Sequence, residues 1–252
     1  MSDHVESEAE LDAEVSAELE LSRSARKKLR KELAARSRSA TPSSDIGSAR
    51  SSRVATPIPT SMPAGRVLPL LICSIGNPGA TYANTLHSAG HTVINHLAEH
   101  LGFASFQKER DFGNGLVSKG SDPDWTLWQS TSYMNESGRG VRAAHTAWSR
   151  NIPDGEGKLV ILHDELEKPL GAVSVKTVQG ASAKGHNGLK SILAVIGKTP
   201  FVRIGIGIGR PVSREPDDVA RYVLKKMTPA EKAKIEGCVD EVIAKLKQVA
   251  AG

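Results

Sequence analysis

Two short apolar runs, at residues 68–75 and 159–162, constrain the fold of this chain more than any other feature of its sequence. Apolar runs of this length are typical of strands that are buried on both faces, as in a parallel sheet covered by helices. The first run is followed by Asn77 in a Gly-Asn-Pro-Gly turn, and the second by Asp164. Both runs therefore indicate buried strands that end abruptly where the chain leaves the sheet.

Segments with helical spacing alternate with the predicted strands. Apolar residues recur every three or four positions at residues 93–101 and 189–196, and a helix is also expected at 140–150. Thr228 begins a Thr-Pro-Ala-Glu helix start, from which we expect one helix to about residue 248. Further strands are expected at residues 125–129, 173–177 and 202–208. This alternation predicts an α/β fold, with a mixed, largely parallel central sheet flanked by helices.

Composition divides the chain into two parts. All ten aromatic residues follow position 66, and residues 1–65 carry ten basic and ten acidic residues. A segment without aromatic residues cannot bury enough apolar surface to offset its ordering entropy, so we expect a disordered N-terminal extension at 1–65 and one globular domain at 66–252. No apolar run approaches the roughly 18 residues of a membrane span. The two cysteines, Cys73 and Cys238, are too few for a disulfide framework.

Polar side chains follow several of the predicted strands. Asn77, Asn135 and Asp164 each follow one strand, and His186 and Asn187 begin a predicted helix. In an α/β sheet, ligands bind where loops leave the carboxyl ends of the strands. The first N–H groups of a helix also favour anions when they are free. These residues together predict a binding site at one edge of the sheet.

His87 is the candidate general base, because an imidazole with an ordinary pKa near 6.5 transfers protons well at neutral pH. Asp164, at a neighbouring strand exit, can accept a hydrogen bond that fixes the tautomer of His87. The alternative is a structural histidine that braces the start of a helix. Two further His pairs have a spacing of four, but the sequence contains no HExxH motif and no Cys–His cluster, so we expect no metal site.

The glycines at 205, 207 and 209 alternate with isoleucines inside a predicted strand. A dinucleotide-binding fingerprint would instead lie in the turn between a strand and a helix. These positions, which carry no side chain, are better explained by the close approach of another backbone or of a ligand. The second half of the domain is also basic near the predicted site, which indicates either a solvated surface or a nucleic-acid contact.

Motifs in five separate parts of the domain resemble those of the bacterial-type peptidyl-tRNA hydrolase family and occur in the family's order. They are Gly76-Asn77-Pro78-Gly79 with Tyr82, Thr85, His87 and Gly90; Tyr133-Met134-Asn135-Glu136-Ser137-Gly138; His163-Asp164-Glu165-Leu166; Gly185-His186-Asn187-Gly188-Leu189; and Ile206-Gly207-Ile208-Gly209-Arg210-Pro211. The resemblance spans residues 68 to 250, which is nearly the whole predicted domain.

The resemblance implies hydrolysis of the ester that joins a peptide to the 3′-terminal ribose of tRNA, by a monomer with no cofactor and no metal. It implies that His87 activates water, that Asp164 orients His87, and that Asn187 positions the water or stabilises the oxyanion. The residues implied to bind the peptide end of the substrate are Asn77, Tyr82, Met134, Asn135 and His186. Lys176, Arg203 and Lys226 are implied to contact tRNA phosphates near the acceptor end, which gives affinity without sequence preference.

Several positions depart from the family pattern. Leu86 and Ser88 replace the Arg and Asn that usually flank the catalytic histidine, and Gly205 stands where an Arg is common. The loop at 177–185 is longer and less glycine-rich than usual. These changes remove two positive charges and one amide from the neighbourhood of the predicted site.

Two other functions compete with the hydrolase. A non-catalytic RNA-binding protein, similar to the splicing-factor branch of the family, would explain the altered flanks of His87 and the basic part of the extension. A nucleotide-dependent α/β enzyme that uses the glycine strand is a more remote alternative. The presence of both His87 and Asp164 favours the enzyme, because a pure binder has no chemical need for that pair. The acidic start argues against organellar import, yet both the cytoplasm and the mitochondrion remain compatible with the sequence.

Overall fold

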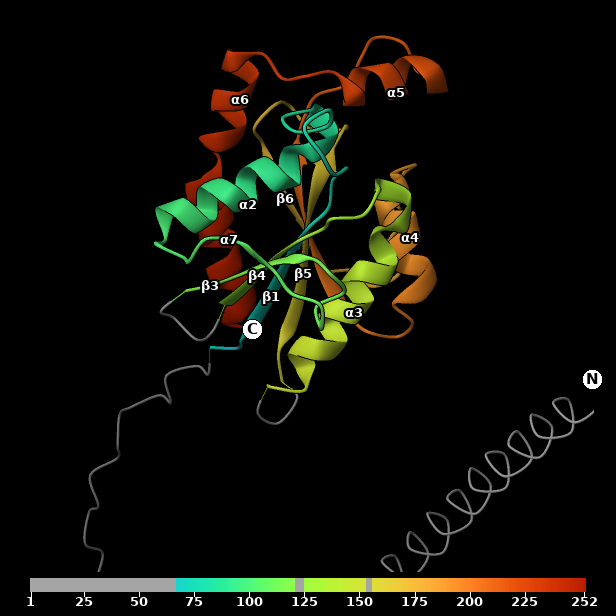
Figure 1. The fold of residues 1–252 in the computed structure, drawn as a ribbon. Coiled ribbons are helices and arrows are strands. Elements are labelled where there is room, and N and C mark those ends of the chain that lie inside the picture. The colour runs from blue at the N-terminus through green and yellow to red at the C-terminus, as the bar shows by residue number, and fades with distance from the viewer. Residues whose placement is uncertain (1–66, 121–124, 153–155) are drawn as a thin grey trace, which may run out of the picture. The chain divides into compact units, whose positions relative to one another are not determined.

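The fold is seen in a computed structural model that describes residues 67–120, 125–152 and 156–252 (Figure 1). The extension predicted at residues 1–65 lies outside this range. In the described part, seven strands form one sheet with the order β2-β3-β4-β1-β5-β7-β6. In that order the strands are β2 (Gln107–Lys108), β3 (Leu116–Lys119), β4 (Trp125–Gln129), β1 (Leu70–Ser74), β5 (Lys158–Glu165), β7 (Phe201–Gly207) and β6 (Val173–Lys176).

The sheet is mixed, as the sequence predicts. The four central strands β4, β1, β5 and β7 run parallel, whereas β2, β3 and β6 at the two edges run antiparallel to their neighbours. Parallel neighbours release their carboxyl ends at the same edge of a sheet. Ser74 of β1 pairs with Leu162 of β5, so the segments that carry Asn77 and Asp164 leave adjacent strands at that edge.

Helices cover both faces of the sheet (Figure 1). They are α2 (Ala89–His100), α3 (Ser137–Ser149), α4 (Asn187–Val195), α5 (Pro216–Leu224), α6 (Pro229–Glu236) and α7 (Val239–Ala250). Leu70 and Ile72 of β1 pack into a core with α2, α6 and α7, whereas Leu71 and Cys73 pack into a second core with α3 and α4. Successive side chains of a strand point to opposite faces, so one continuous apolar run supplies both cores.

In the C-terminal third, one prediction was wrong and one helix was not predicted. The single helix expected from Thr228 to about residue 248 is two helices, α6 and α7, that are separated at Gly237 and Cys238. The predicted start is correct, because the Thr228 hydroxyl accepts a hydrogen bond from the Glu231 N–H and the Glu231 side chain accepts one from the Thr228 N–H. Glycine is a poor helix former, and the helix ends where it stands. Helix α5 was not expected from the sequence.

The glycines of β7 let other parts of the chain approach closely, and at Gly207 the approaching group is backbone, as one of the two interpretations of their spacing predicts. A Cβ at Gly207 would overlap the Pro169 carbonyl oxygen, and a Cβ at Gly205 would lie 3.0 Å from the Glu165 Cβ. Gly207 also exchanges hydrogen bonds with the backbone of Gly171 and Ala172. This face of the strand is therefore covered by the chain itself, which leaves no room there for a dinucleotide.

Replacing Gly207 with alanine is expected to lower the free energy of unfolding by about 1–3 kcal/mol, because the added methyl group forces backbone apart in a packed region. Urea denaturation of the wild type and the variant measures this difference. Gly237→Ala is the control, since Gly237 has φ −65° and a Cβ there would come no closer than 3.1 Å to its neighbours. Equal losses in the two variants would contradict the explanation.

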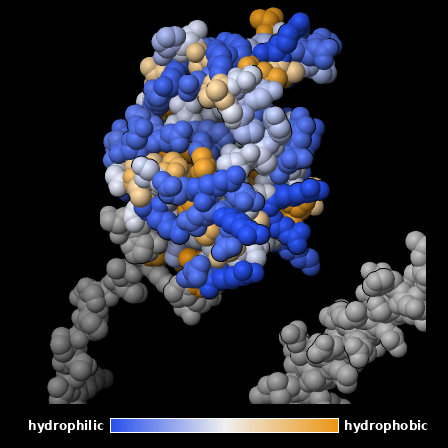
Figure 2. Space-filling model, viewed as in Figure 1, coloured by the Kyte–Doolittle hydropathy of each residue, from blue (hydrophilic) through white to orange (hydrophobic). Residues whose placement is uncertain are grey.

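The face of the domain seen in Figure 2 is largely hydrophilic, with apolar residues in small separate spots. Within the described residues, no helix combines the length and the apolar character needed to cross a bilayer.

Candidate active site

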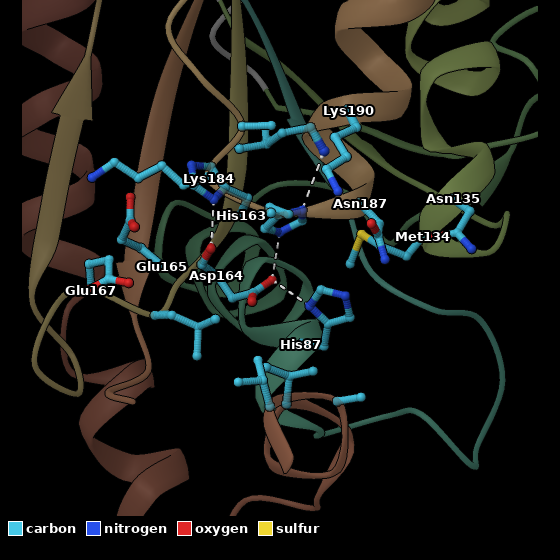
Figure 3. A pocket seen from close by; sticks show the side chains of 18 of the residues that line it. His87, Met134, Asn135, His163, Asp164, Glu165, Glu167, Lys184, Asn187 and Lys190 are labelled. Atoms are coloured by element: carbon cyan, nitrogen blue, oxygen red, sulfur yellow. Dashed lines mark hydrogen bonds and ion pairs between the residues drawn. The ribbon is translucent and has the colours of Figure 1, made fainter. Parts of the chain in front are cut away.

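The structure brings His87, Asp164 and His186 together at the carboxyl edge of the sheet. Asp164 lies near the end of β5 and is 3% exposed. Its Oδ1 atom lies 2.9 Å from Nδ1 of His87 and 2.9 Å from Nε2 of His186. Figure 3 shows the carboxyl group of Asp164 with a dashed line to the ring of His87. The contact between His87 and Asp164 that the sequence predicts is therefore present, and a second histidine shares the same oxygen.

His87 is placed by a short 3-10 turn, η1 (Leu86–Ser88), that leads into α2. Leu86 and Ser88 on either side of it are buried, and the His87 side chain between them is 14% exposed. Gly90 allows the first turn of α2 to approach β5, because a Cβ there would lie 2.7 Å from the Leu162 carbonyl oxygen. This close packing brings His87 to Asp164.

The hydrogen bonds assign a tautomer to each histidine. His186 is the N-cap of α4, and its Nδ1 accepts hydrogen bonds from the N–H groups of Gly188 (3.1 Å) and Leu189 (3.3 Å). Nε2 of His186 therefore carries the proton that is donated to Asp164. His87 donates from Nδ1 to the same oxygen, which leaves the lone pair on its Nε2 on the side of the ring away from Asp164. A neutral His87 held in this way is a base.

The cap also corrects one expectation about the start of α4. The sequence suggested that the first N–H groups of this helix are free to bind an anion. In the structure, those of Gly188 and Leu189 donate to His186 instead. The cap thus fixes the ring of His186 from one side while Asp164 fixes it from the other.

Burial and charge have opposing effects on the pKa values of this group. Burial raises the pKa of Asp164, but the electrostatic interactions and hydrogen bonds with His87 and His186 outweigh it and hold the pKa well below its usual value. Burial likewise lowers the pKa of His87, and the charge and hydrogen bond of Asp164 reverse this, so the net pKa is raised above the ordinary histidine value. Asp164 is therefore ionised at neutral pH and stabilises an imidazolium at His87.

His163 and Glu165 flank Asp164, and their surroundings were not predicted from the sequence. Nδ1 of His163 donates to the Asp164 carbonyl oxygen at 2.7 Å and so holds the main chain at this residue. Burial lowers the pKa of His163 to about 4, so it is neutral at physiological pH. Glu165 forms an ion pair with Lys176 of the antiparallel strand β6. The only signal for these residues in the sequence was their position beside Asp164.

A cavity of about 750 Å³ opens beside this group. Among the predicted peptide-binding residues, Asn77, Met134, Asn135 and His186 line it, as does Asn187. Asn77 accepts a hydrogen bond from the Met134 N–H at 2.8 Å, which joins the turn after β1 to the short turn η2 (Met134–Glu136). Asn135 and Asn187 are exposed and leave their amide groups available to a ligand.

Tyr82 is the one predicted peptide-binding residue that does not line the cavity in the described part of the chain. Its ring packs edge-on against Tyr133, with 6.2 Å between ring centroids, and Tyr133 does line the cavity. The carbonyl oxygen of Tyr82 accepts hydrogen bonds from the hydroxyl groups of Thr85 (2.9 Å) and Ser88 (3.0 Å). Tyr133 was missed by the sequence analysis, although it stands beside Met134 in the second motif.

The two residues that flank His87 pack and hydrogen-bond within the domain. Leu86 is fully buried in the core with α2. The hydroxyl group of Ser88 donates to the Tyr82 carbonyl and lies 3.1 Å from the Thr85 hydroxyl. The departures from the family pattern at these positions thus contribute to packing and to the loop before His87.

The three cations predicted to contact tRNA each have partners inside the chain. Lys176 pairs with Glu165. Arg203 is 3% exposed, and its guanidinium donates to the carbonyl oxygens of Ser182 (3.0 Å) and Ala181. Lys226 is exposed and donates from Nζ to two loop carbonyls.

Other basic residues lie on the wall of the cavity. Lys184, Lys190 and Arg214 line it, are exposed, and form no ion pair within the described part of the chain. Figure 3 shows Lys184 and Lys190 around the same opening as Asp164. Lys184 and Lys190 belong to the basic second half of the domain.

The side chains of His87, Asp164 and His186 are also close enough to hold a metal ion, because their ligand atoms lie within 4.8 Å of one another. A metal ligand needs a lone pair directed at the ion. Here Nε2 of His186 and Nδ1 of His87 carry protons directed at Asp164, so hydrogen bonding accounts for the short distances. The arrangement fits acid–base chemistry better than metal ligation.

The chain is similar in sequence to known proteins. The family model described as peptidyl-tRNA hydrolase matches residues 71–252. The chain is 36% identical to the peptidyl-tRNA hydrolase of Mycobacterium tuberculosis strain H37Rv over 167 residues, which cover 66% of this chain and 83% of that protein. It is 38% identical to the enzyme of Haemophilus influenzae over 172 residues, which cover 68% and 84% of the two chains.

Solved structures show the same similarity. The crystal structure of peptidyl-tRNA hydrolase from Acinetobacter baumannii matches with a TM-score of 0.59 and 32% identity, over 74% of this chain and 89% of that one. A complex of a peptidyl-tRNA hydrolase with N-propanol matches with a TM-score of 0.60 and 31% identity, over 75% and 91%. The fold, the motifs and the matched length lead to one conclusion: this chain belongs to the peptidyl-tRNA hydrolase family.

Proposed function

We propose that this chain hydrolyses the ester bond between the peptide and the 3′-terminal ribose of peptidyl-tRNA and so releases tRNA for reuse. The observation that carries the proposal is the arrangement of His87, Asp164 and His186. It leaves an unprotonated nitrogen of His87 beside a cavity large enough for the end of the substrate. Membership of the family supports the same reaction.

In the proposed mechanism, Nε2 of His87 removes a proton from a water molecule, and the oxygen of that water attacks the ester carbonyl carbon. Asp164 stabilises the imidazolium that forms. The tetrahedral intermediate collapses when the bond between the carbonyl carbon and the ribose oxygen breaks. His87 returns its proton to the leaving ribose oxygen, so the products are a peptide carboxylic acid and a tRNA with a free hydroxyl group.

Amide side chains complete the proposed site. Asn187 and Asn135 are exposed within the cavity wall and can donate hydrogen bonds, so we assign to them the stabilisation of the oxyanion and the holding of the peptide main chain. Asn77 supports this wall through its hydrogen bond to Met134. Tyr133, with Tyr82 packed against it, offers an apolar surface to the peptide.

We assign the tRNA phosphate contacts to Lys184, Lys190 and Arg214. These residues surround the cavity and have no ion-pair partner within the described residues, whereas Lys176, Arg203 and Lys226 are engaged inside the chain. A cation that is not already paired gains most from a phosphate, because it loses no internal contact on binding.

Neutralising Lys190 with Lys190→Gln is expected to weaken tRNA binding and raise KM while kcat stays nearly constant. The slope of log affinity against log salt concentration should become less steep by about 0.7–0.9, the value for one lost phosphate contact. Binding of deacylated tRNA at several salt concentrations measures the slope. Lys198→Gln is the matched control, because Lys198 is exposed beyond the opposite end of the same helix. Equal slopes for Lys190→Gln and the wild type would contradict the assignment.

The alternative of a non-catalytic RNA-binding protein is not favoured. An RNA-binding surface requires exposed cations, but it has no need of a buried carboxylate that orients two histidines. We expect the protein to act as a monomer in a compartment where translation occurs, either the cytoplasm or the mitochondrion.

The function is tested by release of the N-acyl-amino acid from a purified N-acyl-aminoacyl-tRNA. Release by the wild type that increases in proportion to enzyme concentration supports the proposal. A folded wild type that binds tRNA without releasing the acyl group would refute the hydrolase and restore the RNA-binding alternative.

A further inference from the structure

Lys226 lies on a segment that joins α5 to α6 and runs beside the loop before His87. The Met227 N–H donates to the Asn84 carbonyl at 2.8 Å, and the Leu86 N–H donates to the Lys225 carbonyl at 3.2 Å. Thr85 and Lys226 form an isolated antiparallel bridge between these hydrogen bonds. The two segments therefore form a short piece of sheet directly beside the η1 turn.

The ammonium group of Lys226 extends this contact into the loop itself. It donates to the Ala80 carbonyl at 2.8 Å and to the Ala83 carbonyl. Two of its three N–H donors are thus directed at main-chain oxygens. In the described part of the chain, the cavity wall includes Leu224 but not Lys226, so this side chain is directed at the loop and not at the cavity.

The loop that Lys226 contacts determines where His87 lies. Asn84 has a left-handed conformation, with φ 58°, which asparagine adopts more readily than most residues other than glycine. The N–H groups of Tyr82 and Ala83 both donate to the Gly79 carbonyl at 3.1 Å. The next residues are Thr85, Leu86 and His87, so a shift of the loop is transmitted over a few bonds to the base.

Arg203 makes the same kind of contact with the loop before His186. Its buried guanidinium donates to the Ser182 and Ala181 carbonyls of the loop that leads into His186. The two loops that carry the histidines are therefore each held by a cation from a distant part of the chain.

We propose that Lys226 is a positioning residue, whose ammonium group holds the carbonyl groups of the loop at 79–84 and thereby holds His87 in its productive place. This inference rests on the proposed function, because it concerns the rate of that reaction. It assigns to Lys226 a role different from the phosphate contact that its place in the sequence implied.

Three measurements on Lys226→Met test the proposal, since methionine keeps most of the stem but has no donor. We expect kcat to fall about 10- to 100-fold, the scale of a misplacement of about 1 Å at a reacting group. The affinity for deacylated tRNA and its salt dependence should stay at wild-type values. Lys226→Arg, which still donates to carbonyls, should recover part of kcat.

The control is Lys225→Met. Lys225 is exposed, and its side chain pairs with Glu231 and lies over the ring of Tyr222, away from the loop carbonyls. This variant should retain wild-type kcat. Thermal unfolding of all variants separates a local shift of the loop from a loss of the fold.

Hydrogen exchange provides a measurement that does not depend on activity. The amides of Tyr82 and Ala83 should exchange faster in Lys226→Met than in the wild type, while those in β5 are unchanged. A wild type without hydrolase activity would refute the proposed function, and the exchange rates would still decide whether Lys226 holds the loop. Unchanged exchange and kcat, together with weaker tRNA binding and a salt slope less steep by about 0.7–0.9, would overturn the inference in favour of a phosphate contact.

Discussion

Replacing His87 with alanine is expected to lower the rate of peptidyl-tRNA hydrolysis by about 10²- to 10⁴-fold, the contribution of a positioned general base. The geometry gives the reason. Nδ1 of His87 is held by Asp164, so its other nitrogen is the one available to accept a proton from water. Release of an N-acyl-amino acid from its tRNA ester, at saturating substrate, measures the effect on kcat.

Two control measurements show whether the loss of rate comes from removing the base. His100→Ala removes an exposed histidine from the end of α2, the helix that follows η1, and should leave kcat unchanged. The His87→Ala protein should still bind deacylated tRNA with nearly wild-type affinity, because the proposed phosphate contacts lie on other elements. A His87→Ala enzyme that retains more than about a tenth of wild-type kcat would rule out general base catalysis by this residue.

Asp164→Asn is expected to lower kcat by at least about 10²-fold and to move the acid limb of the pH–rate profile to lower pH. His87 must be neutral to act as a base, so activity rises as pH increases through its pKa. In the wild type, Asp164 raises that pKa above the ordinary value despite burial. Without the carboxylate, burial still lowers the pKa of His87, so the neutral form persists to a lower pH.

The two effects of Asp164→Asn act in opposite directions and can be separated. The variant has more neutral His87 at acid pH, yet it loses the charge that stabilises the imidazolium in the transition state. Asp240→Asn is the control, since Asp240 is an exposed carboxylate beside His100. This variant should change neither kcat nor the position of the acid limb. An acid limb that stays in place after Asp164→Asn would mean that a group other than His87 titrates in this pH range.

Much of the fold follows from local features of the sequence. The runs at 68–75 and 159–162 are too short for typical helices and too apolar for surface strands, and they became the two central strands β1 and β5. The helix start at Thr228 is also local, because all of its hydrogen bonds lie within four residues. The sequence pattern did not predict the break between α6 and α7 or the presence of α5.

The contact between His87 and Asp164 was predictable for a related reason. Parallel neighbours in a sheet end at the same edge, so polar residues that follow two such strands lie close together. Asn77 and Asp164 therefore lie at one edge, and His87 follows the first turn at a distance of ten residues from Asn77. His186 was expected to lie near this edge, but its hydrogen bond to the oxygen of Asp164 that His87 also uses was not.

The contacts that the cations make inside the chain could not be predicted from the sequence. The family resemblance implied that Lys176, Arg203 and Lys226 contact tRNA phosphates. In the folded chain, Lys226 donates to a carbonyl that is 146 residues away in sequence, and Arg203 donates to carbonyls 21 and 22 residues away, contacts that the sequence pattern did not predict.

Local patterns in the sequence were enough to predict the buried strands, the edge at which they end, and the presence of a histidine and a carboxylate at that edge. These follow from apolar periodicity and chain direction, which are properties of short segments. Which hydrogen-bonding groups are already satisfied depends on the tertiary structure. A charged side chain is paired or available according to which distant backbone groups folding brings to it, and no local pattern records that.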